Sequence, residues 1–250
     1  MTQLAAAVRN RADLRASDIA EMYALFAGYY ADTSETAFRS DLADKTHVIV
    51  LYAGERIAGF STVTLIESPA SGPHYRTIFS GDTIIDREHW GEQGLALAFC
   101  TFAGTLKSQL PEVPLYWFLI SKGYRTYRYL HLFSKQYWPS YRDQGAPAIK
   151  QVLDAVASRK FGACYDAATS VIRFPQSRGH LRPDFATVRE NLRERPEVRF
   201  FLERNPNFAA GEELACITLL DASNLRSVAL RAFTAGLEQG RCLETALDDA

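Results

Sequence analysis

The spacing of apolar and polar residues predicts alternating strands and helices over the first 138 residues. Apolar positions recur at helical spacing within 15–30, where Ser17 or Asp18 is the expected N-cap. Two β-branched runs flank Ala53–Arg56 and predict a hairpin, and Gly81 predicts a bulge in the strand that contains it. The expected elements are a strand at 4–9, helices at 15–30 and 34–45, strands at 47–53, 56–67 and 76–86, a helix ending near 110, a strand at 114–121 and a helix at 122–138.

The pattern beyond residue 140 continues with further helices and strands. We expect helices at 146–161, 184–194 and 223–239, strands at 164–174 and 213–220, an ambiguous segment at 197–208 and a frayed tail at 243–250. No repeat, low-complexity segment or clear linker interrupts the chain. We therefore expect a single domain over 1–250, in which 1–140 forms the core and 141–250 forms a long C-terminal extension.

Composition and charge exclude several classes of protein. The net charge of −1 gives no global attraction to nucleic acid. The four cysteines are far apart and form no CxxC pair, so we expect no metal site. The N-terminus has no signal-peptide pattern and no apolar run approaches 18 residues, so we expect no membrane span and a cytoplasmic location.

Three stretches resemble parts of the GNAT family of N-acetyltransferases. Residues 8–26 are similar to its first strand and helix, 48–65 to its second and third strands, and 83–99 to its fourth strand, pyrophosphate loop and third helix. The resemblance implies an α/β (α+β) fold of the GNAT-like acyl-CoA N-acyltransferase type, with a mixed central sheet flanked by helices. It also implies acetyl-CoA or another acyl-CoA as cosubstrate.

The turn "GEQGLA" at 91–96 is the expected pyrophosphate site. The family pattern places Arg or Gln first, Gly three residues later and Gly or Ala two residues after that. Gly94 and Ala96 match the small positions, whereas Gly91 occupies the leading position and a second frame begins at Gln93. The expected cradle consists of the backbone of Gly91, Gln93, Gly94, Leu95 and Ala96. Free N–H groups and the helix dipole attract phosphate, although the carboxylate of Glu92 opposes it. The alternative is a tight turn alone.

A tyrosine-rich helix follows the apolar strand at 114–121. The resemblance implies that one tyrosine of this helix protonates the departing thiolate of CoA. The family spacing favours Tyr129, whereas a shared helical face with Tyr124 and His131 favours Tyr127. We rank Tyr127 before Tyr129 and keep both, with aromatic core residues as the alternative.

Positive charge near these tyrosines comes from Lys122, Arg125 and Arg128. These side chains are expected to hold a CoA phosphate or to meet an acidic carrier protein, and a solvated helix face is the alternative. The backbone of Ile85 is expected, from the resemblance, to pair with the thioester carbonyl.

Asp82 is the expected general base, because burial of a carboxylate raises its pKa toward a useful range. Asp86, Glu88 and His89 are alternatives at the end of the same strand.

Together these features predict an N-acyltransferase that moves an acyl group from acyl-CoA, or from a carrier-protein thioester, to an amine of a small molecule. A non-catalytic ligand-binding or interaction module of the same fold is the alternative. The expected partner is the small-molecule acceptor, and an acyl carrier protein and a homodimer are left open.

Overall fold

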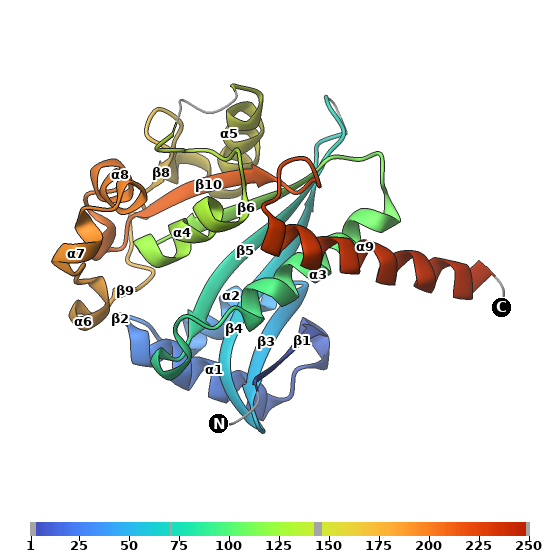
Figure 1. Cartoon of the computed structure of the whole chain (residues 1–250). Helices are drawn as coiled ribbons and strands as arrows, with labels where there is room; N and C mark the ends of the chain where they lie inside the picture. Colours follow the sequence, from blue (N-terminus) through green and yellow to red (C-terminus); the bar gives the residue numbers. More distant parts are fainter. Residues whose placement is uncertain (1–3, 71, 143–146, 249–250) are drawn as a thin grey trace.

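A mixed eight-stranded sheet forms the centre of this computed structural model, which describes residues 4–70, 72–142 and 147–248 (Figure 1). Neighbouring strands are antiparallel except β5 and β6, which are parallel. In spatial order the strands are β1 (Leu4–Asn10), β3 (His47–Ala53), β4 (Arg56–Glu67), β5 (Arg76–Ile85), β6 (Leu115–Ser121), β10 (Glu213–Leu219), β8 (Val171–Ile172) and β7 (Tyr165–Asp166). A separate pair joins β2 (Tyr30–Ala31) to β9 (His180–Leu181). The mixed α/β class predicted from the sequence is confirmed.

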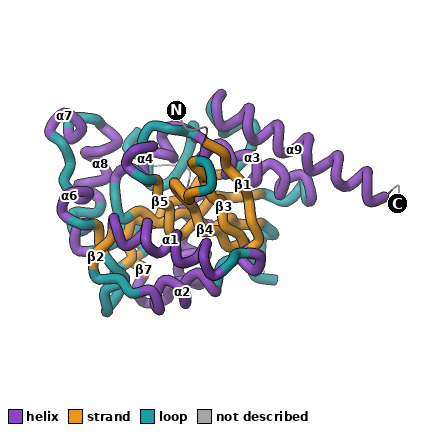
Figure 2. The backbone as a smooth tube through the Cα atoms, turned by 90° about the horizontal axis from the view of Figure 1, so that it is seen from below, coloured by secondary structure: helices purple, strands orange, loops and turns teal. Residues whose placement is uncertain are grey.

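Helices cover both faces of the sheet, because the central strands are apolar on both sides (Figure 2). One face packs against α1 (Ala16–Tyr29), α2 (Glu35–Ala43) and α5 (Pro147–Phe161), and the other against α3 (Gly94–Gln109), α4 (Tyr124–Phe133) and α9 (Ser227–Asp248). Three short helices precede β10, namely α6 (Pro183–Ala186), α7 (Glu190–Arg193) and α8 (Pro196–Arg204). Among the described residues, no helix is both long enough and apolar enough to cross a membrane.

A bulge in β5 separates this strand from β6. Ser61 pairs with Thr83 and Val63 with Ser80, so that Gly81 and Asp82 together face a single residue of β4. A side chain at Gly81 would press against the Thr62 hydroxyl at 2.8 Å. The parallel pairing with β6 ends at Ser80, although β5 continues to Ile85. Since bulges bend strands and increase their twist, the two strands diverge from this point. The bulge predicted at Gly81 is confirmed.

The C-terminal helix packs unusually close to α3. A Cβ atom on Gly104 would overlap the Phe233 carbonyl oxygen, and one on Gly236 would overlap the carbonyl oxygen of Thr101. The Thr105 hydroxyl donates to the carbonyl of Gly236 at 3.2 Å. Glycine is therefore required on both helices, and the outer part of α9 extends away from the body of the molecule (Figure 1).

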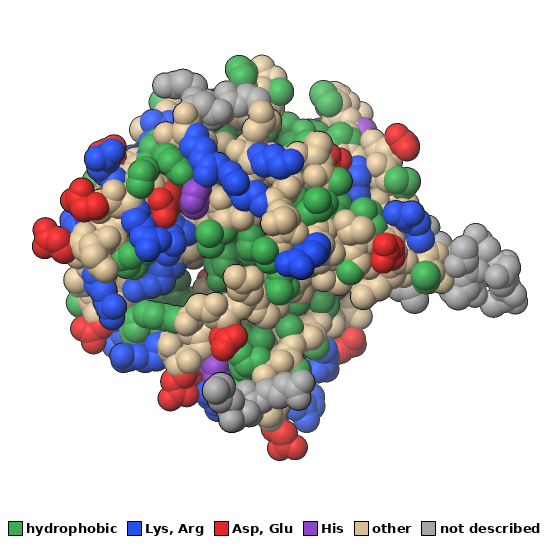
Figure 3. Space-filling model, in the orientation of Figure 1, with side chains coloured by type: hydrophobic (Ala, Val, Ile, Leu, Met, Phe, Trp, Pro, Cys, Tyr) green, Lys and Arg blue, Asp and Glu red, His purple; other side chains and the backbone are tan. Residues whose placement is uncertain are grey.

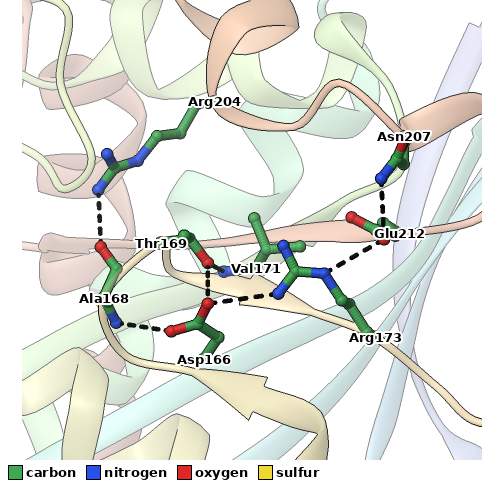
Figure 4. A network of polar contacts seen from close by, with 8 residues as sticks. All are labelled: Asp166, Ala168, Thr169, Val171, Arg173, Arg204, Asn207 and Glu212. Atoms are coloured by element: carbon green, nitrogen blue, oxygen red, sulfur yellow. Dashed lines mark hydrogen bonds and ion pairs between the residues drawn. The ribbon is translucent and has the colours of Figure 1, made fainter.

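A polar network fastens the β7–β8 hairpin to the segment before β10 (Figure 4). The Arg173 guanidinium contacts Asp166 at 3.3 Å and Glu212 at 3.2 Å, and Arg204 donates to the Ala168 carbonyl at 3.4 Å. These contacts hold the inserted segment with α6–α8 against the edge of the sheet.

Several expected boundaries differ from the structure. The helix expected at 122–138 ends at Phe133, because the next residues bridge to Leu225 and Ile217. The strand expected at 164–174 is a two-stranded hairpin, and the helix expected at 184–194 is two single turns. The ambiguous segment contains α8, and the tail expected at 243–250 is helical as far as Asp248. Ala146, at the start of the expected helix 146–161, lies outside the described residues, as do 249 and 250.

Candidate active site

A cavity of about 530 Å³, here called the α4 cavity, opens where β5 and β6 diverge. Its walls come from the end of β5, the turn before α3, the length of α4 and the segment 181–192. Figure 3 shows a hollow on this face with Lys and Arg side chains along its edge. The described residues that line it include Ile84, Ile85, Trp90, Gly91, Glu92, Gln93, Tyr124, Arg125, Arg128, Tyr129, Phe185 and Arg189.

A second cavity of about 760 Å³, here called the α2–α5 cavity, lies on the opposite face of the sheet. It is bounded by α2, the end of α5, and the central strands beneath them. The described residues that line it include Phe38, Asp41, Lys45, Phe79, Asp82, Ile120, Lys122, Lys160, Phe174, Arg178 and Glu213.

The two cavities share three lining residues, Tyr30, Thr83 and Thr126. Thr83 is on β5 just after the bulge, and Thr126 is on α4 just after β6. Tyr30 comes from the β2–β9 pair, in which it faces Leu181. Residues of β5, α4 and the β2–β9 pair therefore lie between the two cavities.

Asp82 lies at the floor of the α2–α5 cavity, where burial raises the pKa of its carboxyl to about 6. Its carboxylate accepts no hydrogen bond and forms no ion pair among the described residues. The nearby Glu213 carboxyl also has a raised pKa, again because of burial, and contacts the Lys122 ammonium at 3.5 Å. The nearby ammonium groups of Lys122 and Lys45 lower the pKa of Asp82 in part, but neither of them forms an ion pair with it.

The two candidate tyrosines lie in different surroundings. Tyr127 is fully buried and donates its hydroxyl to the carbonyl of Pro139 at 2.9 Å, packed against Phe200 and Phe201. Tyr129 lines the α4 cavity, and its hydroxyl has no hydrogen-bond partner among the described residues. Burial raises the pKa of Tyr129, so its phenol stays protonated at neutral pH. This geometry favours Tyr129 over Tyr127, which the sequence ranks first, because Tyr127 is buried and does not line the cavity.

The turn before α3 presents free backbone donors. Gly91 has a φ of 102°, a left-handed conformation that favours glycine, and Gln93 caps α3 without a side-chain hydrogen bond. The N–H groups of residues 93–96 have no acceptor among the described residues. Gly91, Glu92 and Gln93 line the α4 cavity, whereas Leu95 and Ala96 line a small apolar cavity that also touches Tyr129.

Three arginines gather at the α4 cavity, two from α4 and one from the inserted segment. The Arg125 guanidinium lies 4.3 Å from the Trp90 ring centre and donates to the Phe185 carbonyl at 3.1 Å. Arg128 contacts Glu197 at 3.3 Å, whereas Arg189 is exposed and has no ion pair within the described chain. Burial lowers the pKa of Arg125, and the neighbouring arginines lower it further. This cavity therefore carries positive charge suited to phosphate.

Lys122 is expected to bind the donor, but it does not line the α4 cavity. Its ammonium points to the α2–α5 cavity, where it contacts Glu213 and donates to the Arg178 carbonyl at 2.8 Å. Lys122 directly follows β6 and lines the α2–α5 cavity, whereas Arg125 lines the α4 cavity from α4, so of these two residues only Arg125 lies where a donor phosphate is expected.

The alternatives at the end of β5 lie outside the described cavities. Asp86 forms an ion pair with Arg56 at 2.8 Å, which lowers the pKa of its carboxyl together with a backbone hydrogen bond from Glu88. Ile85 lines the α4 cavity, but its carbonyl accepts the indole N–H of Trp90 at 2.8 Å. Asp86 and His89 are therefore not positioned to meet an acceptor on the other face.

Five cavity-lining residues carry no signal in the sequence that marks them as site residues, namely Tyr30, Thr126, Arg189, Lys160 and Glu213. Each lies in a different element, and no local motif links them. Only the arginine content of the segment 178–204 gave a signal that a charged surface would form there.

Comparison with known proteins finds similarity at the level of structure alone. No family model and no curated protein sequence matches the chain. A probable N-acyltransferase from Enterococcus faecalis V583 is 16% identical with a TM-score of 0.40, over 54% of this chain and 33% of that one. An acyl-CoA N-acyltransferase from Pseudomonas aeruginosa is 13% identical with a TM-score of 0.38, over 52% and 86%. A soil-metagenome aminoglycoside acetyltransferase, solved with sisomicin, is 16% identical with a TM-score of 0.34, over 46% and 76%.

This chain spans about one third of the length of the Enterococcus protein. The strand order, the bulge in β5 and the divergence of β5 from β6 are properties of the chain itself. They agree with the mixed central sheet flanked by helices that the sequence resemblance predicts.

Proposed function

We propose that this chain is an N-acyltransferase that moves an acyl group from acetyl-CoA or another acyl-CoA to an amine of a small molecule. The observation that carries the proposal is the passage through the sheet. Two cavities on opposite faces meet at Tyr30, Thr83 and Thr126, where β5 and β6 diverge. A thioester placed in this passage from one side can meet an amine held on the other side.

The α4 cavity suits the donor. The free N–H groups before α3 and the dipole of this 16-residue helix favour a pyrophosphate. Arg125 and Arg189 add positive charge in the place of the missing leading Arg or Gln. Glu92 is exposed at the edge of the cavity, where water screens its charge.

The α2–α5 cavity suits the amine. Asp82 takes one proton from the substrate ammonium, and the nitrogen lone pair that this frees forms a bond to the thioester carbonyl carbon. The adduct nitrogen loses its second proton to water, and collapse of the tetrahedral adduct breaks the carbon–sulfur bond. The thiolate that leaves receives the phenolic proton of Tyr129, which faces the α4 cavity. Water then returns a proton to the Tyr129 phenolate and takes the proton held by Asp82, so the products are an amide, free CoA and one released proton.

Calorimetric titration with acetyl-CoA and free CoA tests the donor site. We expect both to bind, and Arg189→Ala to weaken binding about tenfold, since a charged hydrogen bond is worth about 1.5–3 kcal/mol and this one is partly screened. Arg199→Ala is the matched control, because this exposed arginine lies on α8, outside the cavity, and contacts only Glu203 at 4.0 Å. Absence of binding to either ligand would refute the proposed function.

Tyr129→Phe is expected to lower kcat for CoA release about tenfold. The effect is at the small end for general acids, because a thiolate departs readily even without full protonation. Tyr127→Phe removes a buried hydrogen bond, so it is expected to lower the free energy of unfolding by about 1 kcal/mol with kcat within about twofold. A larger loss of kcat in Tyr127→Phe than in Tyr129→Phe would contradict the assignment.

A further inference from the structure

The α2–α5 cavity has charged groups of both signs at its floor and at its rim. Asp82 at the floor has no partner among the described residues, and Glu213 beside it is only 5% exposed and contacts Lys122. A recessed carboxylate without a partner favours a ligand that brings its own cation or proton donor. The floor of the cavity is therefore the place for the amino group of the acceptor.

The rim carries both acidic and basic side chains. Asp32 and Asp44, which flank α2, are exposed there. Lys160, at the end of α5, and Arg178, after β8, also line the cavity, and neither forms an ion pair among the described residues. An acceptor that spans the cavity from Asp82 to these two cations meets opposite charges at its two ends.

Lys160 is the more constrained of the two rim cations. Its ammonium lies 4.4 Å from the centre of the Phe79 ring, and the Lys45 ammonium lies 5.6 Å from the same centre. Asp41 forms an ion pair with Lys45 at 2.7 Å. Burial lowers the pKa of Lys160 and Lys45 lowers it further, whereas the nearby carboxylates of Asp41 and Asp44 raise it. No carboxylate of the described residues forms an ion pair with Lys160, so its ammonium can contact an anionic group of a ligand.

The second cation and the walls restrict the ligand further. The Arg178 guanidinium lies 4.3 Å from the Phe174 ring centre, with its donors free for a carboxylate or phosphate. The cavity walls between the charged groups are aromatic and comprise Phe26, Tyr30, Phe38, Phe79, Phe161 and Phe174. This combination suits a molecule with an apolar body between an amine and an anion.

We infer that the acceptor is a zwitterionic amine, an amino acid or a close analogue, whose amino group faces Asp82 and whose carboxylate is held by Lys160 and Arg178. The inference rests on the proposed acyl transfer and specifies its substrate class. It assigns Lys160 and Arg178 to acceptor specificity and leaves the donor site unchanged.

The test compares amino acids with the matched amines that lack the carboxylate. Acetyl-CoA consumption is measured with phenylalanine and phenethylamine, tyrosine and tyramine, and leucine and isoamylamine. We expect kcat/KM to be at least tenfold higher for the amino acid in one or more pairs. A phosphate-bearing pair, phosphoethanolamine and ethanolamine, distinguishes a phosphate from a carboxylate as the anion.

Substitutions at the rim then locate the source of the preference. Lys160→Met keeps the apolar stem, and we expect it to reduce the ratio of kcat/KM between amino acid and amine about tenfold. Lys150→Met is the matched control on the same helix, because Lys150 contacts Asp154 at 2.5 Å and does not line the cavity. Arg178→Gln is expected to reduce the ratio as well.

The outcomes separate this inference from the proposed function. If amines react as well as their matched amino acids, or if donor binding is intact and neither member of any pair reacts, the zwitterion assignment is wrong. A preference that survives Lys160→Met and Arg178→Gln together also overturns it. If acetyl-CoA and CoA fail to bind at all, it is the acyltransferase function that fails.

Discussion

Replacement of Asp82 by asparagine is expected to lower kcat/KM for acyl transfer by about 10²–10⁴-fold, the usual contribution of a general base. Asp82 lies at the cavity floor and has a pKa of about 6. Since a base acts in its deprotonated form, kcat/KM of the parent protein should fall as the pH decreases through about 6. The variant should lose this pH dependence. Initial rates of CoA release across pH 5–8 measure both effects.

Asp86→Asn is the matched control for this prediction, because Asp86 lies at the end of the same strand but outside the cavities. We expect its kcat/KM to stay within about threefold of the parent value. Thermal unfolding separates catalysis from folding. The pKa of Asp82 is raised in the folded state, so its ionisation opposes folding above that pKa, and Asp82→Asn should not lower Tm at pH 7. Equal losses in both variants would argue against Asp82 as the base.

The substitution Gly236→Ala should destabilise the protein by about 3 kcal/mol. A methyl group at this position would overlap the Thr101 carbonyl oxygen on α3, which is backbone and cannot turn aside. The helices would have to separate, and overpacking of this kind costs about 1–3 kcal/mol or more. Denaturant unfolding followed by circular dichroism measures the change.

Gly28→Ala provides the control, because Gly28 lies within α1 with nothing near its missing Cβ atom. Alanine has the higher helix propensity, so this variant should be unchanged or more stable by up to about 1 kcal/mol. The pair thus distinguishes the close approach of α3 and α9 from a general effect of adding a methyl group to a helix. A Gly236→Ala protein as stable as the Gly28→Ala protein would show that α9 does not need this contact.

The α3–α9 contact and the donor site are connected through α3. Helix α9 packs along α3, and the start of α3 supplies the free N–H groups beside the α4 cavity. Partial loss of the α3–α9 contact is therefore expected to disturb the donor site before it disturbs the acceptor cavity on the other face. Titration of Gly236→Ala with CoA measures this effect directly.

The order of elements in the first half could be predicted from sequence because each has a local cause. Apolar residues at alternate positions indicate a strand, and apolar residues at helical spacing indicate a helix. The turn at Gly54 and Glu55 joins β3 to β4, as its residue types predict. Ser34 caps α2 by accepting the Ala37 N–H at 3.2 Å. The second half was less predictable, since its short elements form through contacts with distant parts of the chain.

Sequence by itself determined the central strands, the helices α1 to α5, the bulge at Gly81 and the small residues before α3, because these follow from local spacing and backbone preference. Tertiary structure alone decided which side chains share a cavity. Lys122 directly follows β6 and lines the acceptor cavity, whereas Arg125, in the first turn of α4, lines the donor cavity. Residues two positions apart on a helix project in different directions, so Tyr127 is buried whereas Tyr129 lines the α4 cavity.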